Sequence, residues 1–469
     1  KIMEAAEEHN DPGKFTTFNA YEWTVRNQEP ESASYHRNVI FKSSKAPKRP
    51  FSSFDSNNPE QLWSWMDGLR SNGLDSLAIP HNSNGSNGQV FKKYKFDGSP
   101  IDKEYSVQRM RNEPIVEITQ IKGTSETHPR LSPNDKWANF EIVNSRKGKR
   151  TAYSEPDGSY VRQGLQKGLA LKHEERGNPF KIGFIGSTDT HNGAYIFDES
   201  DNVGTAAILT SPEVRGSIPI PNETLTEDIK NSVFIAEEDQ GFYSGGETIS
   251  NSVGGLAAVW AKANTRDSIF EALSNKETYA TSGTRIRLRF FAGENLTNLD
   301  FNDEEFISKM YENGVPMGSD LILSDTKKPS FIIWAQKDKN SAPLQRIQII
   351  KGFYSEKDRE TKEHLIDVVC SDGLKPDPNS KLCASNNAMV NIETCEFSKN
   401  KGASELKTTW VDEEYDPNIE TFYYVRVLEN PTCRWSTWDA IKNNYEPRQG
   451  IDEIIQERAW SSPIWVNSN

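Results

Sequence analysis

The sequence predicts an α/β protein in which a parallel sheet or barrel is followed by a separate β-rich domain. Between about residues 15 and 195, short apolar runs alternate with segments whose apolar residues have helical spacing. Several of these runs are apolar at consecutive positions, as expected for strands that are covered on both faces. Beyond about residue 310, strand-like runs are separated by long polar loops, which indicates a second domain with more β-structure.

The predicted strands of the first part follow one another with helices between them. They cover residues 15–20, 38–41, 76–79, 115–119 and 182–185. One helix starts at Asn58, an N-cap residue followed by a first-turn proline, and a second carries Val161, Leu165 and Leu169 on one face. Because strand–helix–strand units form right-handed crossovers between parallel strands, this order predicts a parallel sheet or barrel.

Further strand patterns occur towards the carboxyl end of the chain. A third helix begins at Thr265 and leads into residues 285–290, which alternate between polar and apolar as a strand with one wet face does. Residues 331–335, 347–350 and 422–428 are also predicted strands. We therefore expect two domains, covering residues 1–305 and 306–469.

The composition excludes two classes of partner. The chain has 68 Asp and Glu against 55 Lys and Arg, a formal net charge of -13. Because proteins that bind nucleic acid by neutralising phosphates need the opposite balance, we expect no nucleic-acid partner. No uninterrupted apolar stretch approaches the ~20 residues needed to cross a bilayer, so we expect no membrane span.

All four cysteines lie in the last quarter of the chain, at Cys370, Cys383, Cys395 and Cys433. None forms a CxxC pair, and no histidine sits among them at zinc-finger spacing. An even number in a loop-rich region predicts two disulfides, and of the three possible pairings we favour Cys370–Cys383 with Cys395–Cys433. Disulfides imply an oxidising compartment, so we expect a periplasmic or secreted protein. Four reduced, buried thiols are the alternative.

Several of the seven histidines and a few carboxylates directly follow predicted strands. His81 comes after one apolar run, Asp189 and His191 come after another, and Glu22 comes after the first. In parallel α/β folds the carboxyl ends of strands converge on one rim, where active sites form. Imidazole and carboxylate groups gathered there suit Zn, Mn or Fe. This pattern predicts a metal site.

Each of these positions also has an ordinary structural explanation. An Asp-x-His pair often occurs by chance, His81 could be a hydrogen-bonded structural residue, and Glu22 could cap a turn. His36 precedes its apolar run rather than following it, which makes it a weaker candidate for a ligand at a shared rim.

Several long segments resemble a known family of bacterial proteins, catalogued as domain of unknown function 3604. The segments are FNAYEWT, YHRNVIF, IPHNSNG, VEITQIKGTSE, GFIGSTDTHNG, NTRDSIFEALSNKETYATSGTRIRL and YYVRVLENPTCRWST. The resemblance extends over nearly the whole chain. The family is in turn similar to the polymerase and histidinol phosphatase (PHP) superfamily. This implies a distorted (β/α)7 barrel with two or three metals, and most members hydrolyse phosphoesters.

The resemblance implies a role for five residues as ligands of divalent metal ions. Glu22 matches the bridging glutamate of the superfamily, His36 and His81 match two single histidines, and Asp189 and His191 match its closing Asp-x-His motif. We expect Asp189, His191 and Glu22 to be catalytic as well.

Three further residues are expected around these ligands. Glu117 matches a strand glutamate, which we expect to support the ligands from behind. Arg37 and Asn82 stand next to expected ligands in the sequence, and on that adjacency we expect them to contact an anionic group of a small-molecule substrate.

The chain also departs from the superfamily. The superfamily opens with a His-x-His motif and a Thr-Asp-His motif, and neither occurs here. We therefore expect that the sequence is a shortened portion of a longer protein that lacks the first barrel strands, with the missing segment as a possible separate partner chain.

The expected function is a metal-dependent hydrolase that acts on a phosphoester or related ester through a metal-activated water. One alternative is an exported, non-enzymatic protein that binds glycans or proteins through Trp410, Trp435 and Trp438. These rings could equally pack one domain against the other. A catalytically incomplete fragment is a further alternative.

Overall fold

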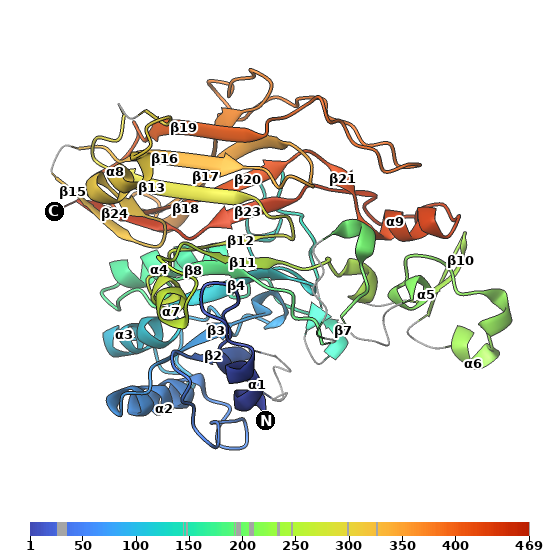
Figure 1. The fold of residues 1–469 in the computed structure, drawn as a ribbon, viewed down its shortest axis with the longest axis horizontal. Helices are drawn as coiled ribbons and strands as arrows, with labels where there is room; N and C mark the ends of the chain where they lie inside the picture. Colours follow the sequence, from blue (N-terminus) through green and yellow to red (C-terminus); the bar gives the residue numbers. More distant parts are fainter. Residues whose placement is uncertain are drawn as a thin grey trace.

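The computed structural model stacks its sheets in layers, with the N-terminal strands at one end and the two larger sheets of the C-terminal half of the chain towards the other (Figure 1). It describes residues 1–25, 35–143, 145–146, 149–191, 193, 198–205, 211–231, 235–244, 247–297, 300–324 and 327–468. None of the described helices is both long and apolar enough to cross a membrane.

The N-terminal part contains two small sheets. The first is antiparallel, with the order β1 (Asn19–Trp23), β2 (Arg37–Phe41), β3 (Ser76–Pro80). The second has the order β5 (Gly123–Thr124), β4 (Ile115–Gln120), β8 (Gly183–Gly186), and its β4–β8 pair is parallel. The helices of this part are α1 (Ile2–Glu8), α2 (Pro59–Ser71), α3 (Lys103–Asn112) and α4 (Val161–His173).

Two larger sheets form the C-terminal part. An eight-stranded sheet contains β11 (Leu256–Val259), β12 (Thr278–Thr281), β23 (Arg458–Ser461), β20 (Thr421–Glu429), β17 (Leu344–Ser355) and β18 (Glu360–Cys370), with β24 (Ile464–Ser468) and β15 (Asp320–Leu323) joined to it through β20. A four-stranded sheet has the order β14 (Val315–Pro316), β13 (Arg287–Gly293), β16 (Ser330–Gln336), β19 (Glu405–Val411). Apolar side chains of both sheets, such as Phe290 and Val425, share one core.

The remaining elements are short. The two-stranded pairs are β6 (Ser145–Arg146) with β7 (Lys149–Tyr153), β9 (Ile235–Glu238) with β10 (Gly241–Ser244), and β21 (Thr432–Cys433) with β22 (Ile454–Ile455). The other α-helices are α5 (Pro212–Arg215), α6 (Glu227–Lys230), α7 (Arg266–Ser274), α8 (Phe306–Asn313) and α9 (Trp435–Lys442). The 3-10 helices are η1 (Ser83–Gly85), η2 (Glu199–Asp201), η4 (Asn222–Thr224) and η5 (Glu247–Ser250).

The predicted (β/α)7 barrel is wrong, because the described strands form several separate sheets and close into no barrel. Consecutive apolar positions did indicate burial on both faces, since β3, β4 and β8 are buried along their whole length. However, the eight-stranded sheet covers part of this surface: Phe184 of β8 packs edge-on against Tyr424 of β20, with ring centroids 5.4 Å apart. The strand–helix–strand order predicted parallel strands, but β2 and β3, which flank α2, pair antiparallel.

The division at residue 305 remains a prediction. The eight-stranded sheet takes β11 and β12 from before that position and its other strands from after it. One apolar core likewise extends from Trp63 of α2 to Trp460 of β23. The two parts of the chain therefore share both a sheet and a core.

A buried network of four charged side chains also joins the two parts. Arg162 of α4 donates to Glu126 at 2.6 Å and to Asp135 at 2.9 Å. Arg426 of β20 donates to Asp135 at 2.8 Å and to Glu126 at 3.2 Å. All four residues are almost completely buried. Each guanidinium thus contacts both carboxylates, which compensates their charges inside the protein.

The predicted disulfide pairing is confirmed. Cys370 is bonded to Cys383 and Cys395 to Cys433, and no cysteine of the chain is free. Such bonds persist in an oxidising environment, so the cysteine chemistry points to a compartment outside the reducing cytosol.

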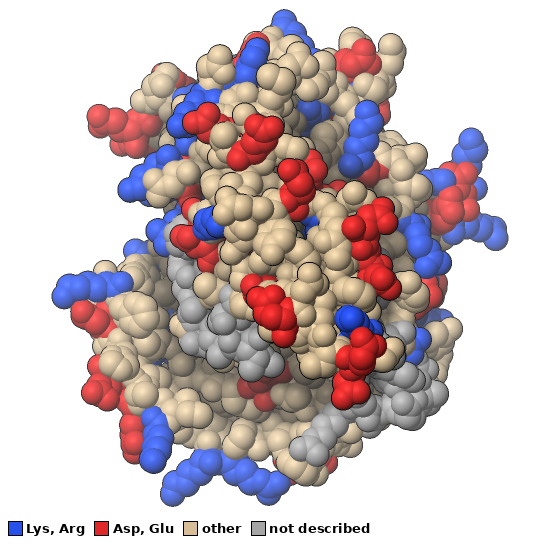
Figure 2. All heavy atoms as spheres, turned by 90° about the vertical axis from the view of Figure 1, so that its right-hand side faces the viewer, with Lys and Arg blue, Asp and Glu red and all other residues tan. Residues whose placement is uncertain are grey.

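Charged side chains are unevenly distributed over one face of the molecule. In Figure 2, Asp and Glu side chains predominate in the middle of the view, while most Lys and Arg side chains lie nearer its margins. This distribution agrees with the net charge of -13.

Candidate metal centre

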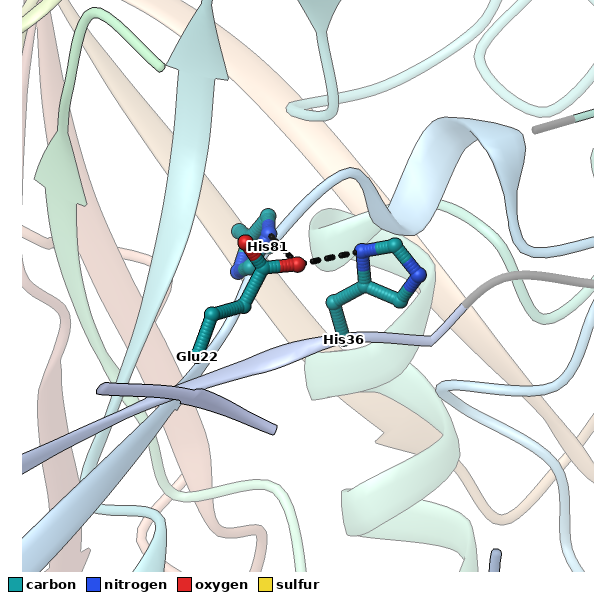
Figure 3. Close-up of side chains that lie close together, drawn as sticks. All are labelled: Glu22, His36 and His81. Carbon is teal, nitrogen blue, oxygen red and sulfur yellow. Dashed lines mark ion pairs between the residues drawn. The ribbon is translucent and has the colours of Figure 1, made fainter. Parts of the chain in front are cut away.

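Glu22, His36 and His81 meet at one edge of the antiparallel sheet β1–β2–β3 (Figure 3). Glu22 lies near the end of β1, His36 immediately precedes β2, and His81 immediately follows β3. Because neighbouring strands run in opposite directions, the start of β2 lies beside the ends of β1 and β3. The backbone N–H of His81 donates to the carbonyl of His36 at 3.3 Å, which holds the two histidine positions together.

The three side chains converge on the carboxylate of Glu22. Its Oε1 lies 2.7 Å from Nδ1 of His36 and 3.7 Å from Nε2 of His81. One ligand atom from each residue lies within 4.8 Å of the others. The imidazole rings are 5.7 Å apart and nearly perpendicular. One carboxylate and two imidazoles at this spacing form a donor set that suits Zn and related transition metals.

His81 is the most buried member of this group, with only 2% of its surface exposed. Burial alone would lower its pKa, but Glu22 and the charges of Glu117 and Asp189 outweigh that effect and raise it. Its Nδ1 is buried without a hydrogen-bond partner. The nitrogen that faces Glu22 is the other one, Nε2, so a metal ion held together with Glu22 would bind Nε2.

Hydrogen bonding to His36 and then to His81 holds the pKa of Glu22 well below its usual range. The carboxylate is therefore ionised at neutral pH. Glu22 and His36 are partly exposed, whereas His81 is not. The group is thus accessible from one side and anchored on the other.

Asp189 lies close to His81 but is occupied by other partners. Its Oδ2 accepts hydrogen bonds from Gln120, at 2.7 Å, and from the ammonium group of Lys122. Asn82 approaches the same oxygen at 3.4 Å. Burial would raise the pKa of Asp189, but the charge of Lys122 outweighs it and lowers the pKa. Asp189 is therefore an ionised carboxylate that is already paired with a cation.

His191 extends from Asp189 towards solvent. Its Nε2 lies 3.4 Å from Oδ1 of Asp189, and its side chain is 59% exposed. Asp189 itself has a positive φ of 51°, an uncommon conformation for a residue other than glycine. The side chain of Asp189, in contrast to that of His191, is only 15% exposed.

Glu117 lies behind these residues, on β4, with 2% of its surface exposed. It accepts a hydrogen bond from the hydroxyl of Ser187. Burial raises the pKa of Glu117, although the charge of His81 acts in the opposite direction. Glu117 therefore lies near enough to His81 and Asp189 for their charges to act on its pKa, while its supporting role stays a prediction.

Arg37 lies apart from this group. Its guanidinium is buried, donates to Glu113 at 2.8 Å and to the carbonyl of Tyr35, and lies against the rings of Trp23 and Tyr35. The structure therefore gives Arg37 a role in packing. Asn82, in contrast, lies within the site, where it contacts both Gln120 and Asp189.

Sequence reasoning missed Lys122 and Gln120. Both come at or just after the end of β4, which is the same kind of position that singled out His81 and Asp189. Amide and ammonium side chains at strand ends are candidates for the same reason as histidines and carboxylates. This wider criterion identifies both residues.

The three tryptophans proposed for glycan binding differ in exposure. Trp435 is fully buried, and its indole N–H donates to the carbonyl of Asn251 at 2.8 Å. Trp410 stacks on Phe331, with ring centroids 5.6 Å apart. Packing thus accounts for Trp435 entirely and for Trp410 in part, while Trp438 lines a cavity.

The family model described as "Protein of unknown function (DUF3604)" matches residues 1–468. The chain belongs to this family. No curated protein and no solved structure matches it. The description of the DUF3604 family names no activity. The residues of the site are therefore the basis for a functional proposal.

Proposed function

We propose that this chain is a metal-dependent hydrolase whose metal is held by Glu22, His36 and His81. The observation that carries the proposal is the convergence of these three side chains, whose ligand atoms lie within 4.8 Å of one another. Catalytic zinc sites use three protein ligands of these types and leave a further position open. The partial exposure of Glu22 and His36 provides access from solvent.

A divalent ion at this position supplies a Lewis acid, which lowers the pKa of a water molecule and offsets negative charge on an ester oxygen. The protein residues around it have separate tasks. The ammonium group of Lys122 and the amide of Asn82 would bind an anionic group of the substrate. His191, which is exposed and lies beside Asp189, would transfer a proton to the leaving group.

The substrate class is a phosphoester or a related ester. Three features support an anionic substrate: the positive charge of Lys122, the amide of Asn82 and the open side of the site. The preference for phosphate comes from the resemblance of the histidine and Asp-x-His motifs to the PHP superfamily. Asp189 and His191, which the sequence suggested as further metal ligands, have other tasks in this proposal, because Lys122 already pairs with Asp189. The two disulfides support a periplasmic or secreted location for the enzyme.

The test measures metal content and activity together. The intact chain is loaded with Zn²⁺ or Mn²⁺, dialysed, and analysed for bound metal and for hydrolysis of a generic aryl phosphate. We expect about one ion per chain, and a Glu22→Gln, His81→Ala double variant should lose it, with activity reduced more than about 100-fold. His9→Ala, at an exposed position after α1, is the matched histidine control and should behave as the unmodified chain. Equal metal content and activity in the double variant would refute the proposal.

A second candidate function is ligand binding in a cleft of about 450 Å³ that Trp137 and Trp410 line together. Aromatic rings in the wall of a cleft suit the apolar faces of sugars. A glycan-binding screen on the metal-free chain distinguishes this function from hydrolysis, and Trp410→Ala should abolish any binding found there.

A further inference from the structure

A cavity of about 300 Å³ lies where the segment before β6 meets the segment that leads into β23. Residues between positions 136 and 141 form part of its wall, and residues between positions 452 and 458 form another part. None of the residues that line the cavity belongs to the candidate metal centre. A ligand bound in this cavity would therefore occupy a second, separate site.

The guanidinium of Arg458 lies beside this cavity, although Arg458 is only 3% exposed. Its Nε donates to the carbonyl of Gln456 at 3.2 Å, and its Nη1 donates to the carbonyl of Trp137 at 3.0 Å. Its central carbon lies 3.7 Å from the ring centroid of Phe140. Because Arg458 and all three residues that its guanidinium contacts line the cavity, the guanidinium forms part of the cavity wall.

Arg458 is a buried cation without a counter-charge. Among the residues that the structure describes, it forms no ion pair, and its Nη2 has no hydrogen-bond partner. The carboxylates of Glu126 and Asp135 attract it, but they belong to the buried four-residue network and are hydrogen-bonded there. Burial lowers the pKa of Arg458, and the positive charge of Arg426 lowers it further. A buried charge without a partner is costly, so an anion beside Arg458 would stabilise the folded protein.

The other charged groups of the cavity wall occur in opposite pairs. Glu141 accepts two hydrogen bonds from Arg434, at 2.8 and 2.9 Å. Lys136 and Asp452 carry opposite charges, and both are exposed. The charge of Arg458 is therefore the one that remains uncompensated, which matches a ligand with a single negative charge.

The wall also offers both hydrogen-bond donors and apolar surface. A guanidinium has five N–H groups, so three remain on Arg458 after the two bonds to backbone carbonyls. A carboxylate accepts such groups in pairs. The rings of Trp137 and Phe140 and the side chain of Ile455 supply apolar surface in the same cavity. These features suit a ligand that has one anionic end and an apolar body.

We propose that this cavity binds a small organic monocarboxylate, whose carboxylate pairs with Arg458 and whose apolar part lies against Phe140 and Trp137. A carboxylate suits the three free N–H groups of the guanidinium and supplies the single negative charge that the wall lacks. Inorganic phosphate fits less well, because it has no apolar part to bury against the two rings. This site does not depend on the proposed hydrolase activity.

The experiment uses the full chain with sodium benzoate as the probe and benzamide as its neutral counterpart of similar shape. For a ligand of this size we expect a benzoate dissociation constant of about 10⁻⁴–10⁻³ M by isothermal titration calorimetry. At constant ionic strength, about 10 mM benzoate should raise the midpoint of thermal unfolding by roughly 1–3 °C. Benzamide should produce no shift, because it cannot compensate the charge of Arg458.

Variants then assign the binding to the cavity. Arg458→Gln removes the charge and should weaken benzoate binding at least about tenfold. Ser385→Glu is a second variant that does not alter the buried side chain, since Ser385 is an exposed residue of the cavity wall. Its carboxylate should weaken binding by a similar factor, because it either repels the ligand or pairs with Arg458 itself. Ser404→Glu, at an exposed serine outside the cavity wall, is the matched control and should bind benzoate as the unmodified chain does.

Three results would overturn the proposal. The first is the absence of benzoate binding in the unmodified chain, or an equal response to benzamide. The second is unchanged benzoate affinity in Ser385→Glu together with unchanged affinity in a folded Arg458→Gln variant. The third is a larger thermal shift with inorganic phosphate than with benzoate at the same concentration, which would assign the site to phosphate. His81→Ala should retain the benzoate response, and this result would separate the cavity from the candidate metal centre.

Discussion

Single residues at the ends of strands carry the chemistry of the candidate metal centre. His81 is placed by β3 and Asp189 by β8, and the charge of Asp189 acts on His81 even though more than a hundred residues separate them in the chain. Lys122 occupies the oxygen of Asp189 that faces this region. A lysine therefore already neutralises one of the two carboxylates that the sequence suggested as metal ligands.

This arrangement gives a prediction for Lys122→Met. Loss of the ammonium group removes a positive charge near the metal position, so affinity for Zn²⁺ should rise roughly tenfold, which corresponds to about 1.4 kcal/mol of relieved repulsion. Hydrolysis of an anionic ester should nevertheless become slower, because the substrate loses a counter-charge. Competition with a zinc-binding dye measures the affinity, and steady-state kinetics measures the activity. Lower zinc affinity in the variant would mean that Lys122 supports the metal site instead of opposing it.

The candidate site was predictable at the level of residues, because its signal is local. A polar side chain directly after an apolar run marks a strand end, and this rule found Glu22, His81 and Asp189. His36 is a weaker candidate by this rule because it precedes its strand, which is a disadvantage only in a parallel sheet. In the antiparallel sheet that the structure shows, the start of β2 lies at the same edge as the end of β3, so the position of His36 is the expected one.

At the scale of elements, local sequence signals identified the helices and strands but not their directions. Asn58 caps α2 as its sequence indicates, accepting from the N–H of Glu60, and Thr265 caps α7. Strand direction depends on contacts between distant segments. The apolar pattern of β3 and β8 requires cover on both faces, but it does not distinguish a layer of helices from the antiparallel sheet that contains β20.

The two disulfides differ in the length of chain that they close, which makes a prediction at the same scale. Cys370 and Cys383 are 13 residues apart, whereas Cys395 and Cys433 are 38 apart. If the main effect is to restrict the unfolded chain, replacing the Cys395–Cys433 pair by alanines should cost about 1 kcal/mol more unfolding free energy than replacing the Cys370–Cys383 pair. Urea unfolding of both double variants provides the comparison. An equal or smaller loss for the longer loop would show that contacts in the native state dominate.

At the scale of the whole molecule, shared structure couples the two parts of the chain. The core that contains Trp63 also contains Trp460, and the four-residue network links α4 to β20. The sequence change near residue 310 indicated a second domain but carried no information about these contacts. Buried Arg and Glu residues look like surface residues in a sequence, because their partners lie hundreds of positions away.

The buried network predicts how this coupling depends on charge and pH. Burial would raise the pKa of Asp135, but the charges of Arg426 and Arg162 outweigh it and hold the pKa below its usual range. The ionised network therefore stabilises the fold above about pH 4, the usual pKa of an aspartate, and this contribution is lost as the pH falls further.

Arg426→Met leaves two buried carboxylates with one guanidinium and should cost about 3–5 kcal/mol at pH 7. The difference from the unmodified chain should shrink below pH 4, because the unfolded chain then binds protons that the ionised network of the folded unmodified chain excludes, whereas the poorly compensated carboxylates of the variant can take up protons. Urea unfolding at pH 7 and pH 3.5 measures both effects, and Lys328→Met, at an exposed pair with Glu413, should leave stability unchanged. A cost for Arg426→Met that stays the same at both pH values would assign the loss to packing and not to charge.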